Sequence, residues 1–341
     1  MSSTSEDEEI AALFREVNAY FTTKLKLKGG KAIGSGAFGG AWVYNELDEL
    51  GQFKRKVVIK AALEEGDETF LNEVQHLTAV LGAEHIVRLL YVGPMPNPGR
   101  DLSRYAFVMD FVEHGTWVDI LIRFTEEGKK IPNRILWGVF LCLARACVGM
   151  AYPRRGGVDD PPWRETIDPS VQPETRIHRD MNFGNVLPRG NGLMGLQLID
   201  FGLAKHLPVD DEFGVKIGIK DNINEIARVV MWLAIGHRGY DVSEVEVRDG
   251  PGEPLRTIMS RGHGDLEDDC ISDDLKYLIR RCRAYDLRER PRLDDLVRAC
   301  EHAVFNHTAA DYANLKEPWN RNETDDAIDA VIQKFILDAP Y

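Results

Sequence analysis

The spacing of apolar residues divides the chain into a strand-rich first third and a helix-rich remainder. Apolar residues near the N-terminus recur every three or four positions, which predicts a helix from residue 5 to about residue 20. Short apolar or alternating runs then predict a helix at 68–81 and strands at 27–33, 41–44, 56–61, 86–92 and 105–112. After Gly115 the pattern is mainly helical, with short strands near residues 186 and 196–199. Strands followed by helices predict an α+β fold with two lobes.

Four regions follow from this pattern: an N-terminal helical extension (1–22), a small β-rich lobe (23–112), a larger helical lobe (113–306) and a C-terminal helical tail (307–341). The helical lobe is interrupted at residues 153–176, which are rich in Pro and Gly and show no periodicity. A loop of this length inside a compact domain is uncommon, and it is often functional or disordered. The tail has amphipathic helical spacing, and we expect it to pack back onto the helical lobe.

Composition excludes some classes of function. A net charge of −13 argues against general nucleic-acid binding, which needs a basic surface. Arg145 interrupts the apolar run at 135–152, so this run predicts a buried helix rather than a membrane span. The five cysteines form no C-x-x-C pair, and the acidic first residues lack the apolar core of a signal peptide. We therefore expect a cytoplasmic or nuclear monomer with reduced thiols and with no nucleic-acid or membrane partner.

A glycine motif, G-S-G-A-F-G, occupies residues 34–39 after a predicted strand. Alone, G-x-G-x-x-G indicates either a dinucleotide-binding turn or an ordinary glycine loop. A dinucleotide-binding turn should open a helix, whereas residues 41–44 continue as a strand. The motif therefore predicts a hairpin tip at which small residues let backbone N–H groups approach phosphate oxygens.

Two charged residues follow the glycine motif. Lys60 ends an apolar strand, V-V-I-K, and Glu73 lies within the next predicted helix. A lone lysine at a strand end usually extends to solvent, and a lone helical glutamate usually faces water. As a pair, they can hold one another and the α- and β-phosphates of ATP.

The run at 175–186, T-R-I-H-R-D-M-N-F-G-N-V, and the later D-F-G at 200–202 carry the remaining polar groups. Each could be only a polar loop at a strand end. In a functional interpretation, Asp180 accepts the proton of an attacking hydroxyl, while Asn185 and Asp200 hold Mg²⁺. Phosphoryl transfer needs this division of roles, because its catalysis is mostly positioning and charge neutralisation.

In this order the motifs resemble the eukaryotic protein kinase family, from about Ala32 to Cys300. The resemblance implies two lobes with ATP between them, and catalytic roles for Lys60, Glu73 and Asp180. It implies that Leu77, His178 and Phe201 pack as a spine, that Asp221 begins a central helix, and that D-L-R-E-R-P at 286–291 is the late Arg-Pro signature. The implied nucleotide contacts are Gly34, Ser35, Gly36, Phe38, Gly39, Lys60, Met109 and a hinge that includes Asp110 and Val112. The insert and the run H-R-D-M-N-F-G-N also resemble kinase-like proteins expanded in filamentous fungi.

The sequence departs from the family pattern in two places. Asn182 stands where serine/threonine kinases usually have a lysine that contacts the γ-phosphate, so the charge compensation must move or the transfer must slow. Only eighteen residues separate Gly202 from Asp221, and A-P-E is absent. Recognition of a peptide substrate is therefore in doubt, and Arg290, which usually pairs with the missing glutamate, must find another partner or face water.

The same eighteen residues contain no Ser, Thr or Tyr, so phosphorylation within residues 203–220 cannot switch the protein on. One hypothesis is that Asp210, Asp211 or Glu212 supplies a fixed carboxylate to Arg179 in place of a phosphate. The alternative is that this acidic trio is only a solvated turn.

These features predict a protein kinase that uses ATP and Mg²⁺ to phosphorylate Ser or Thr of an unidentified protein substrate. One alternative is a pseudokinase that acts as a nucleotide-binding scaffold. A small-molecule kinase is a third possibility, but Arg179 and the Phe201-Gly202 pair argue against it, because such kinases typically carry H-x-D without the arginine and lack D-F-G.

Overall fold

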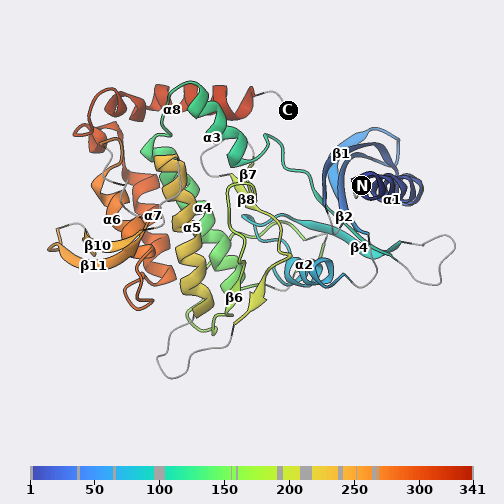
Figure 1. Cartoon of the computed structure of the whole chain (residues 1–341), viewed down its shortest axis with the longest axis horizontal. Coiled ribbons are helices and arrows are strands. Elements are labelled where there is room, and N and C mark those ends of the chain that lie inside the picture. The colour runs from blue at the N-terminus through green and yellow to red at the C-terminus, as the bar shows by residue number, and fades with distance from the viewer. Residues whose placement is uncertain are drawn as a thin grey trace.

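The first third of the chain folds around one antiparallel sheet, as the alternating pattern predicted (Figure 1). In this computed structural model the described residues are 3–36, 39–63, 67–95, 104–154, 156–158, 160–189, 195–207, 217–236, 241–250, 252–262, 266 and 269–339. The sheet has the order β1-β2-β3-β5-β4. Its strands are β1 (Leu27–Gly36), β2 (Gly39–Leu47), β3 (Phe53–Ala62), β4 (Leu89–Met95) and β5 (Arg104–Asp110). The strand predicted at 86–92 begins three residues later than expected, because residues 81–88 form a separate linker.

Helix α1 (Ser3–Lys24) covers one face of this sheet (Figure 1). Leu13, Val17 and Phe21 are fully buried and pack in one cluster with residues of β2, β3 and β5. The ring of Phe14 stacks on Trp42 of β2, with 5.8 Å between the ring centroids. The helical extension predicted at the N-terminus is therefore an integral layer of the small lobe.

Helix α2 (Glu68–Ala79) packs against the opposite face of the sheet. Phe70 contacts Phe107 of β5 with 5.1 Å between the ring centroids, and the side chain of Asp67 caps the helix by accepting from the backbone of Phe70. Leu71 is one of the apolar residues whose spacing predicts this helix, but its side chain is 40% exposed. Glu73 and His76 are buried instead, so the inward face of α2 is partly polar.

The remainder of the chain is mainly helical, which confirms the predicted two-lobed α+β fold. Its main helices are α3 (Trp117–Glu126), α4 (Asn133–Ala151), α5 (Ile217–Ile235), α6 (Asp273–Cys282) and α7 (Leu293–Asn306). Helix α4 is long and apolar enough to cross a membrane, but it is 94% buried inside the lobe. Arg145, which interrupts its apolar sequence, is paired with Glu301 of α7 at 2.9 Å. All five cysteines are buried, and none of them forms a disulfide.

Short strand pairs carry the motif residues at the junction of the two lobes. Strand β6 (Arg176–Ile177) pairs with β9 (Lys205–His206), and β7 (Val186–Pro188) pairs with β8 (Leu196–Leu198). The run that contains Asp180 lies between β6 and β7, and Asp200 lies between β8 and β9. The pairing therefore holds the two loops side by side.

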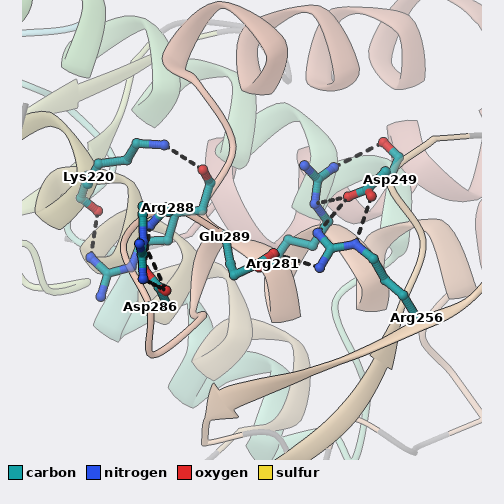
Figure 2. Close-up of polar contacts among 8 residues, drawn as sticks. Lys220, Asp249, Arg256, Arg281, Asp286, Arg288 and Glu289 are labelled. Carbon is teal, nitrogen blue, oxygen red and sulfur yellow. Dashed lines mark hydrogen bonds and ion pairs between the residues drawn. The ribbon is translucent and has the colours of Figure 1, made fainter. Parts of the chain in front are cut away.

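A two-stranded hairpin, β10 (Val242–Val247) with β11 (Arg256–Arg261), replaces the helical structure expected after α5. Val245, Val247 and Ile258 form a small core with Ala284, next to α6. Charged contacts reinforce it: Figure 2 shows Asp249 between Arg256 and Arg281, and the nitrogen–oxygen distances of these pairs are 2.8 and 3.0 Å. The expectation of helices alone was wrong here, although V-S-E-V-E-V at 242–247 has the alternation of a strand.

The C-terminal tail packs onto the helical lobe, as expected. It contains two 3₁₀ turns, η1 (Ala309–Tyr312) and η2 (Trp319–Glu323), then α8 (Asp325–Ile332) and a π-helical turn, η3 (Gln333–Leu337). Phe335 stacks on Phe124 of α3 at 4.2 Å between the ring centroids, and Arg123 donates to the Phe335 carbonyl at 2.9 Å. Glu323 is buried and accepts from the backbone and side chain of Asn133 at the start of α4.

Candidate active site

The glycine motif forms the tip of the β1–β2 hairpin, where Gly36 pairs with Gly39. Gly39 has φ +154, and a Cβ there would collide with the carbonyl oxygen of Ala61, so only glycine fits. A Cβ on Gly34 would meet no atom within 4 Å, which leaves its surroundings open. Ser35 is exposed and pairs with Gly40, whereas Phe38 lies outside the described residues.

Lys60 and Glu73 form the predicted ion pair between β3 and α2, with 2.5 Å between Nζ and Oε2. Lys60 also lies 3.6 Å from Oδ1 of Asp200, so these three motif residues meet at one point. Burial raises the pKa of Glu73 to about 7, against the opposing effect of Lys60. Burial alone would lower the pKa of Lys60, but the charges of Glu73 and Asp200 outweigh it and the pKa is raised.

Asp180 is held by two asparagine side chains. Nδ2 of Asn185 donates to Oδ2 and to the backbone carbonyl of Asp180, both at 2.9 Å. Nδ2 of Asn182 donates to Oδ1 of Asp180 at 3.0 Å, and its Oδ1 accepts from the Gly184 backbone at 2.8 Å. Asn182 is therefore part of the scaffold that orients the Asp180 carboxylate.

Leu77, His178 and Phe201 are buried in one core, as the spine interpretation predicted. The rings of His178 and Phe201 meet edge to face at 4.6 Å. Burial lowers the pKa of His178 to about 4, so the ring is neutral at neutral pH. Its Nε2 donates to the carbonyl of Ile199 at 3.0 Å, and its Nδ1 accepts from the Asp180 backbone at 3.2 Å. This neutral imidazole therefore connects the Asp180 loop to the residue before Asp200.

A polar stripe on α2 contacts the segment after Asp200, and the sequence analysis missed it. Nδ2 of Asn72 donates to the carbonyls of Gly202 at 2.9 Å and Ala204 at 2.8 Å. A Cβ on Gly202 would lie 2.9 Å from the Thr69 methyl group, so the two backbones approach closely there. The only sequence signal was the position of Asn72 next to Glu73 on the same helix.

Arg176, rather than Arg179, is the buried arginine of this region. It is 3% exposed, donates to the ring of His76 on α2, and pairs with Glu174 at 2.7 Å. Burial, with the charge of Arg176, lowers the pKa of His76 to about 4, so its neutral ring can accept. Arg179 is exposed and makes no hydrogen bond or ion pair within the part of the chain that the structure describes. Its proposed partners Asp210, Asp211 and Glu212 lie outside the described residues.

The central helix α5 begins at Ile217, so Asp221 lies inside it rather than at its start. The Asp221 carboxylate pairs with Arg290 at 3.0 Å. Arg290, whose usual glutamate partner is missing, therefore has another carboxylate as its partner. Arg290 also donates to the carbonyls of Lys220 and Ala284. The neighbouring Asn222 supports the Asp180 loop, since its side chain accepts from the His178 backbone at 3.1 Å and donates to the Arg176 carbonyl at 2.8 Å.

The predicted hinge follows directly from β5. Met109 is partly buried against the main core, and Val112 is 7% exposed. The Asp110 backbone donates to the carbonyl of Arg88, and its carboxylate pairs with Arg55 at 3.2 Å. The hinge is therefore anchored on one side by β3 and on the other by the start of β4.

The oxygen atoms available here suit Mg²⁺. Asn185 uses its amide nitrogen on Asp180, which leaves its carbonyl oxygen as a ligand atom, and the side chain of Asp200 is 43% exposed. The backbone N–H of Ile199 donates to the backbone carbonyl of Asn185 at 3.0 Å, so the segments that carry Asn185 and Asp200 lie side by side. Carboxylate and amide oxygens are ligands that Mg²⁺ accepts in phosphate sites. The open surroundings of Gly34 and the partly exposed Lys60 likewise fit a nucleotide phosphate.

Comparison with known proteins finds kinases, although no family model matches the chain. The chain is 24% identical over 284 residues to the G2-specific protein kinase fin1 of Schizosaccharomyces pombe, covering 79% of this chain and 38% of that protein. It is 24% identical over 287 residues to mitogen-activated protein kinase kinase kinase 1b of Physcomitrium patens, covering 79% and 32%. It is 25% identical over 298 residues to the serine/threonine-protein kinase pakB of Dictyostelium discoideum, covering 84% and 31%.

The chain thus spans little more than a third of the length of the first of these relatives, and about a third of the other two. The similarity extends over most of this chain, and all three relatives are named as protein kinases. The fold has two lobes, and the separated motifs meet at their junction. Over most of its length the chain is therefore similar, at a distance, to the protein kinase family.

Proposed function

We propose that this chain transfers the γ-phosphoryl group of ATP to Ser or Thr hydroxyls of a protein substrate. The observation that carries the proposal is the meeting of Lys60, Glu73 and Asp200 within ion-pair distances of one another. Asp180 is oriented by Asn182 and Asn185 with its carboxylate ready to accept the proton of an attacking hydroxyl. Bound Mg²⁺ would be held by Asn185 and Asp200, and it would neutralise charge on the phosphates.

We further propose that the activity needs no phosphate in residues 203–220. That segment has no hydroxyl side chain, and its start is already fixed by Asn72 and by the pairing of β9 with β6. Arg176 pairs with His206 in the ladder of β6 and β9 and also contacts His76 of α2, whose ring centroid lies 5.5 Å from that of His206. The start of this segment is thus held by side chains and backbone groups of the chain itself, without a phosphate.

A direct assay tests both proposals. Purified full-length protein would be treated with a phosphatase, then incubated with Mg²⁺·ATP and a protein extract, with phosphosites mapped against an Asp180→Asn control. We expect new phosphosites on Ser and Thr with the wild type only, at the same rate with or without the phosphatase step. Phosphate on Tyr alone would contradict the Ser/Thr assignment. Loss of activity after phosphatase treatment would show that a phosphate elsewhere in the chain is required, and would contradict the inference that the chain's own side chains replace an activating phosphate.

The alternative from a different class is a pseudokinase that binds nucleotide as a scaffold. The observation that favours it is Asn182, because the position lacks the positive charge that kinases usually place near the γ-phosphate. This alternative predicts that calorimetry detects nucleotide binding, whereas the transfer assay detects no new phosphosites with either the wild type or Asp180→Asn.

A further inference from the structure

The insert, residues 153–176, is packed against the linker, residues 81–88, which joins α2 to β4. The backbone N–H of Trp163 donates to the carbonyl of Gly82 at 2.8 Å, and its carbonyl accepts from Glu84 at 3.1 Å. These two bonds form a short parallel bridge between Trp163 and Ala83. The indole Nε1 of Trp163 also donates to the Leu81 carbonyl at 3.0 Å.

Two residues further along, Glu165 binds His85 of the linker through both carboxylate oxygens. Oε1 accepts from the His85 backbone and Oε2 contacts Nδ1, each at 2.7 Å. Glu165 is 5% exposed and His85 is 2% exposed, so the pair is shielded from water. Burial would lower the pKa of His85, but interactions with Cys142 and Glu165 raise it to about 10, so the ring carries a charge at neutral pH. A buried charge depends strongly on its partner, because water cannot replace it.

The insert packs closely against one glycine of the linker, Gly82, and against one glycine of α4, Gly149. A Cβ on Gly82, which has φ +82, would lie 3.2 Å from the Trp163 ring. A Cβ on Gly149 of α4 would lie 3.1 Å from Cγ of Glu165. A side chain at either position would require its neighbour to shift by a few tenths of an ångström, so the insert packs closely here.

The other side of the linker holds β8, the strand that leads to Asp200. The backbone of Leu198 donates to the His85 carbonyl at 2.9 Å, and the Leu198 carbonyl accepts from Val87 at 3.0 Å. Asp200 follows Leu198 by two residues. At its N-terminal end the linker continues directly from α2, which carries Glu73. The linker therefore connects α2, which carries Glu73, to β8, which precedes Asp200.

We propose that the insert positions Glu73 and Asp200 for phosphoryl transfer by fixing this linker, with Glu165 as the main positioning residue and Trp163 as its support. The proposal rests on the proposed function. It assigns a role to a segment whose sequence shows no periodicity. The described residues of this segment make no hydrogen bond or ion pair with the motif residues proposed to hold nucleotide or metal. Small displacements far from the reacting atoms can lower the rate about 100-fold, because the reacting geometry is exacting.

The test compares two variants that each remove one carboxylate from the insert of the full-length protein. Glu165→Gln removes the buried partner of His85. Asp168→Asn is the matched control, because Asp168 is exposed and, among the described residues, its carboxylate accepts hydrogen bonds from Ser170 of its own turn. We expect Glu165→Gln to lower kcat about 10- to 100-fold with little change in the dissociation constant of Mg²⁺·ATP, and Asp168→Asn to match the wild type. Equal kcat values for Glu165→Gln and wild type would overturn the proposal.

A milder variant covers the case in which Glu165→Gln does not fold. Trp163→Phe keeps the packing and removes only the hydrogen bond to Leu81. We expect faster hydrogen exchange in residues 81–88, in α2 and in β8. Faster exchange confined to the insert itself would overturn the proposal.

Two further measurements distinguish an effect of the Glu165–His85 ion pair from an effect of a bound metal ion. The double variant His85→Gln with Glu165→Gln leaves no buried charge and should recover part of the kcat that Glu165→Gln loses; no recovery would contradict the ion-pair role. Glu84, His85 and Glu165 also place three ligand atoms within 4.8 Å of one another, so stoichiometric metal found by elemental analysis would replace the ion pair as the explanation. If the wild type transfers no phosphate, the proposed function fails, whereas the exchange measurements still decide whether the insert orders α2 and β8.

Discussion

The side-chain amide of Asn182 donates to the carboxylate of Asp180 at 3.0 Å, and the Asn182 carbonyl oxygen simultaneously accepts from the Gly184 backbone. A lysine at this position could not make the second bond, because an ammonium group has no acceptor. The exchange of lysine for asparagine therefore removes a charge but adds a fixed turn that orients Asp180.

We predict that Asn182→Ala lowers kcat by about tenfold, roughly the effect of losing one charge-assisted hydrogen bond in the transition state. Steady-state kinetics with a peptide taken from the mapped phosphosites would measure it. Asn182→Ser provides the control, since a hydroxyl can restore part of the hydrogen bonding. An Asn182→Ala variant as fast as the wild type would show that Asn185 alone orients Asp180.

We predict that activity falls on the acidic side of neutrality. Glu73 must be ionised to pair with Lys60, and burial raises its pKa to about 7, so protonation weakens the pair as the pH drops from 8 to 6. Lys60 stays protonated over this range because its pKa is raised. A profile of kcat/KM against pH should therefore show an acidic limb with a midpoint near 7. A profile that stays flat down to pH 5.5 would rule out control by Glu73.

We predict that Arg290→Met destabilises the protein by about 1–3 kcal/mol, because the partly exposed Asp221 carboxylate and two backbone carbonyls lose their donor. Arg290 is 3% exposed and binds Asp221 and the carbonyls of Lys220 and Ala284. Arg288→Met in the same turn is the control, because the Arg288 side chain is 69% exposed and, among the described residues, pairs with Asp286 (Figure 2). Urea unfolding of both variants would measure the difference, and similar losses for the two would refute the assignment.

We predict that Phe21→Ala lowers the free energy of unfolding by about 3–5 kcal/mol, the usual loss for a fully buried aromatic ring. Phe21 is 0% exposed and meets Tyr91 edge to face at 6.0 Å. Phe53→Ala is the comparison, because Phe53 is 61% exposed and its truncation should change stability little. Denaturant midpoints would report both values. A small loss for Phe21→Ala would mean that α1 is only loosely attached.

The sequence allowed prediction of the elements and motif residues whose patterns are local. The helix of α1 and most strands of the sheet follow from the spacing of apolar residues. The roles of Lys60, Glu73, Asp180 and Asp200 were expected from their motifs and from the resemblance of those motifs to the protein kinase family. Hydrophobic periodicity failed on α2, because its inward face contains Glu73 and His76, whose partners lie far away in the chain. The hydrogen bond from Asn72 to Ala204 joins residues far apart in the sequence, so the three- or four-residue spacing of apolar positions cannot predict it.

The insert escaped prediction for a different reason. Its contacts with the linker run largely through backbone groups of Trp163 and through one buried charge pair. Backbone hydrogen bonds place little demand on residue type, so they leave little signal in the sequence. The β10–β11 hairpin did carry a signal, the alternation of Val245 and Val247 with exposed glutamates, but the helical pattern on either side obscured it.

The position of α1 determines how much of the chain is needed to obtain a soluble catalytic fragment. Trp42 and Tyr44 on β2 are 2% and 1% exposed, and they belong to the apolar cluster that this helix covers. A shortened protein that starts at the first strand would present their rings, with Val57 and Ile59, as one apolar surface to water. Exposed apolar surfaces of this kind promote association. Expression of the chain without residues 3–24 should therefore yield aggregates, whatever the state of the active site.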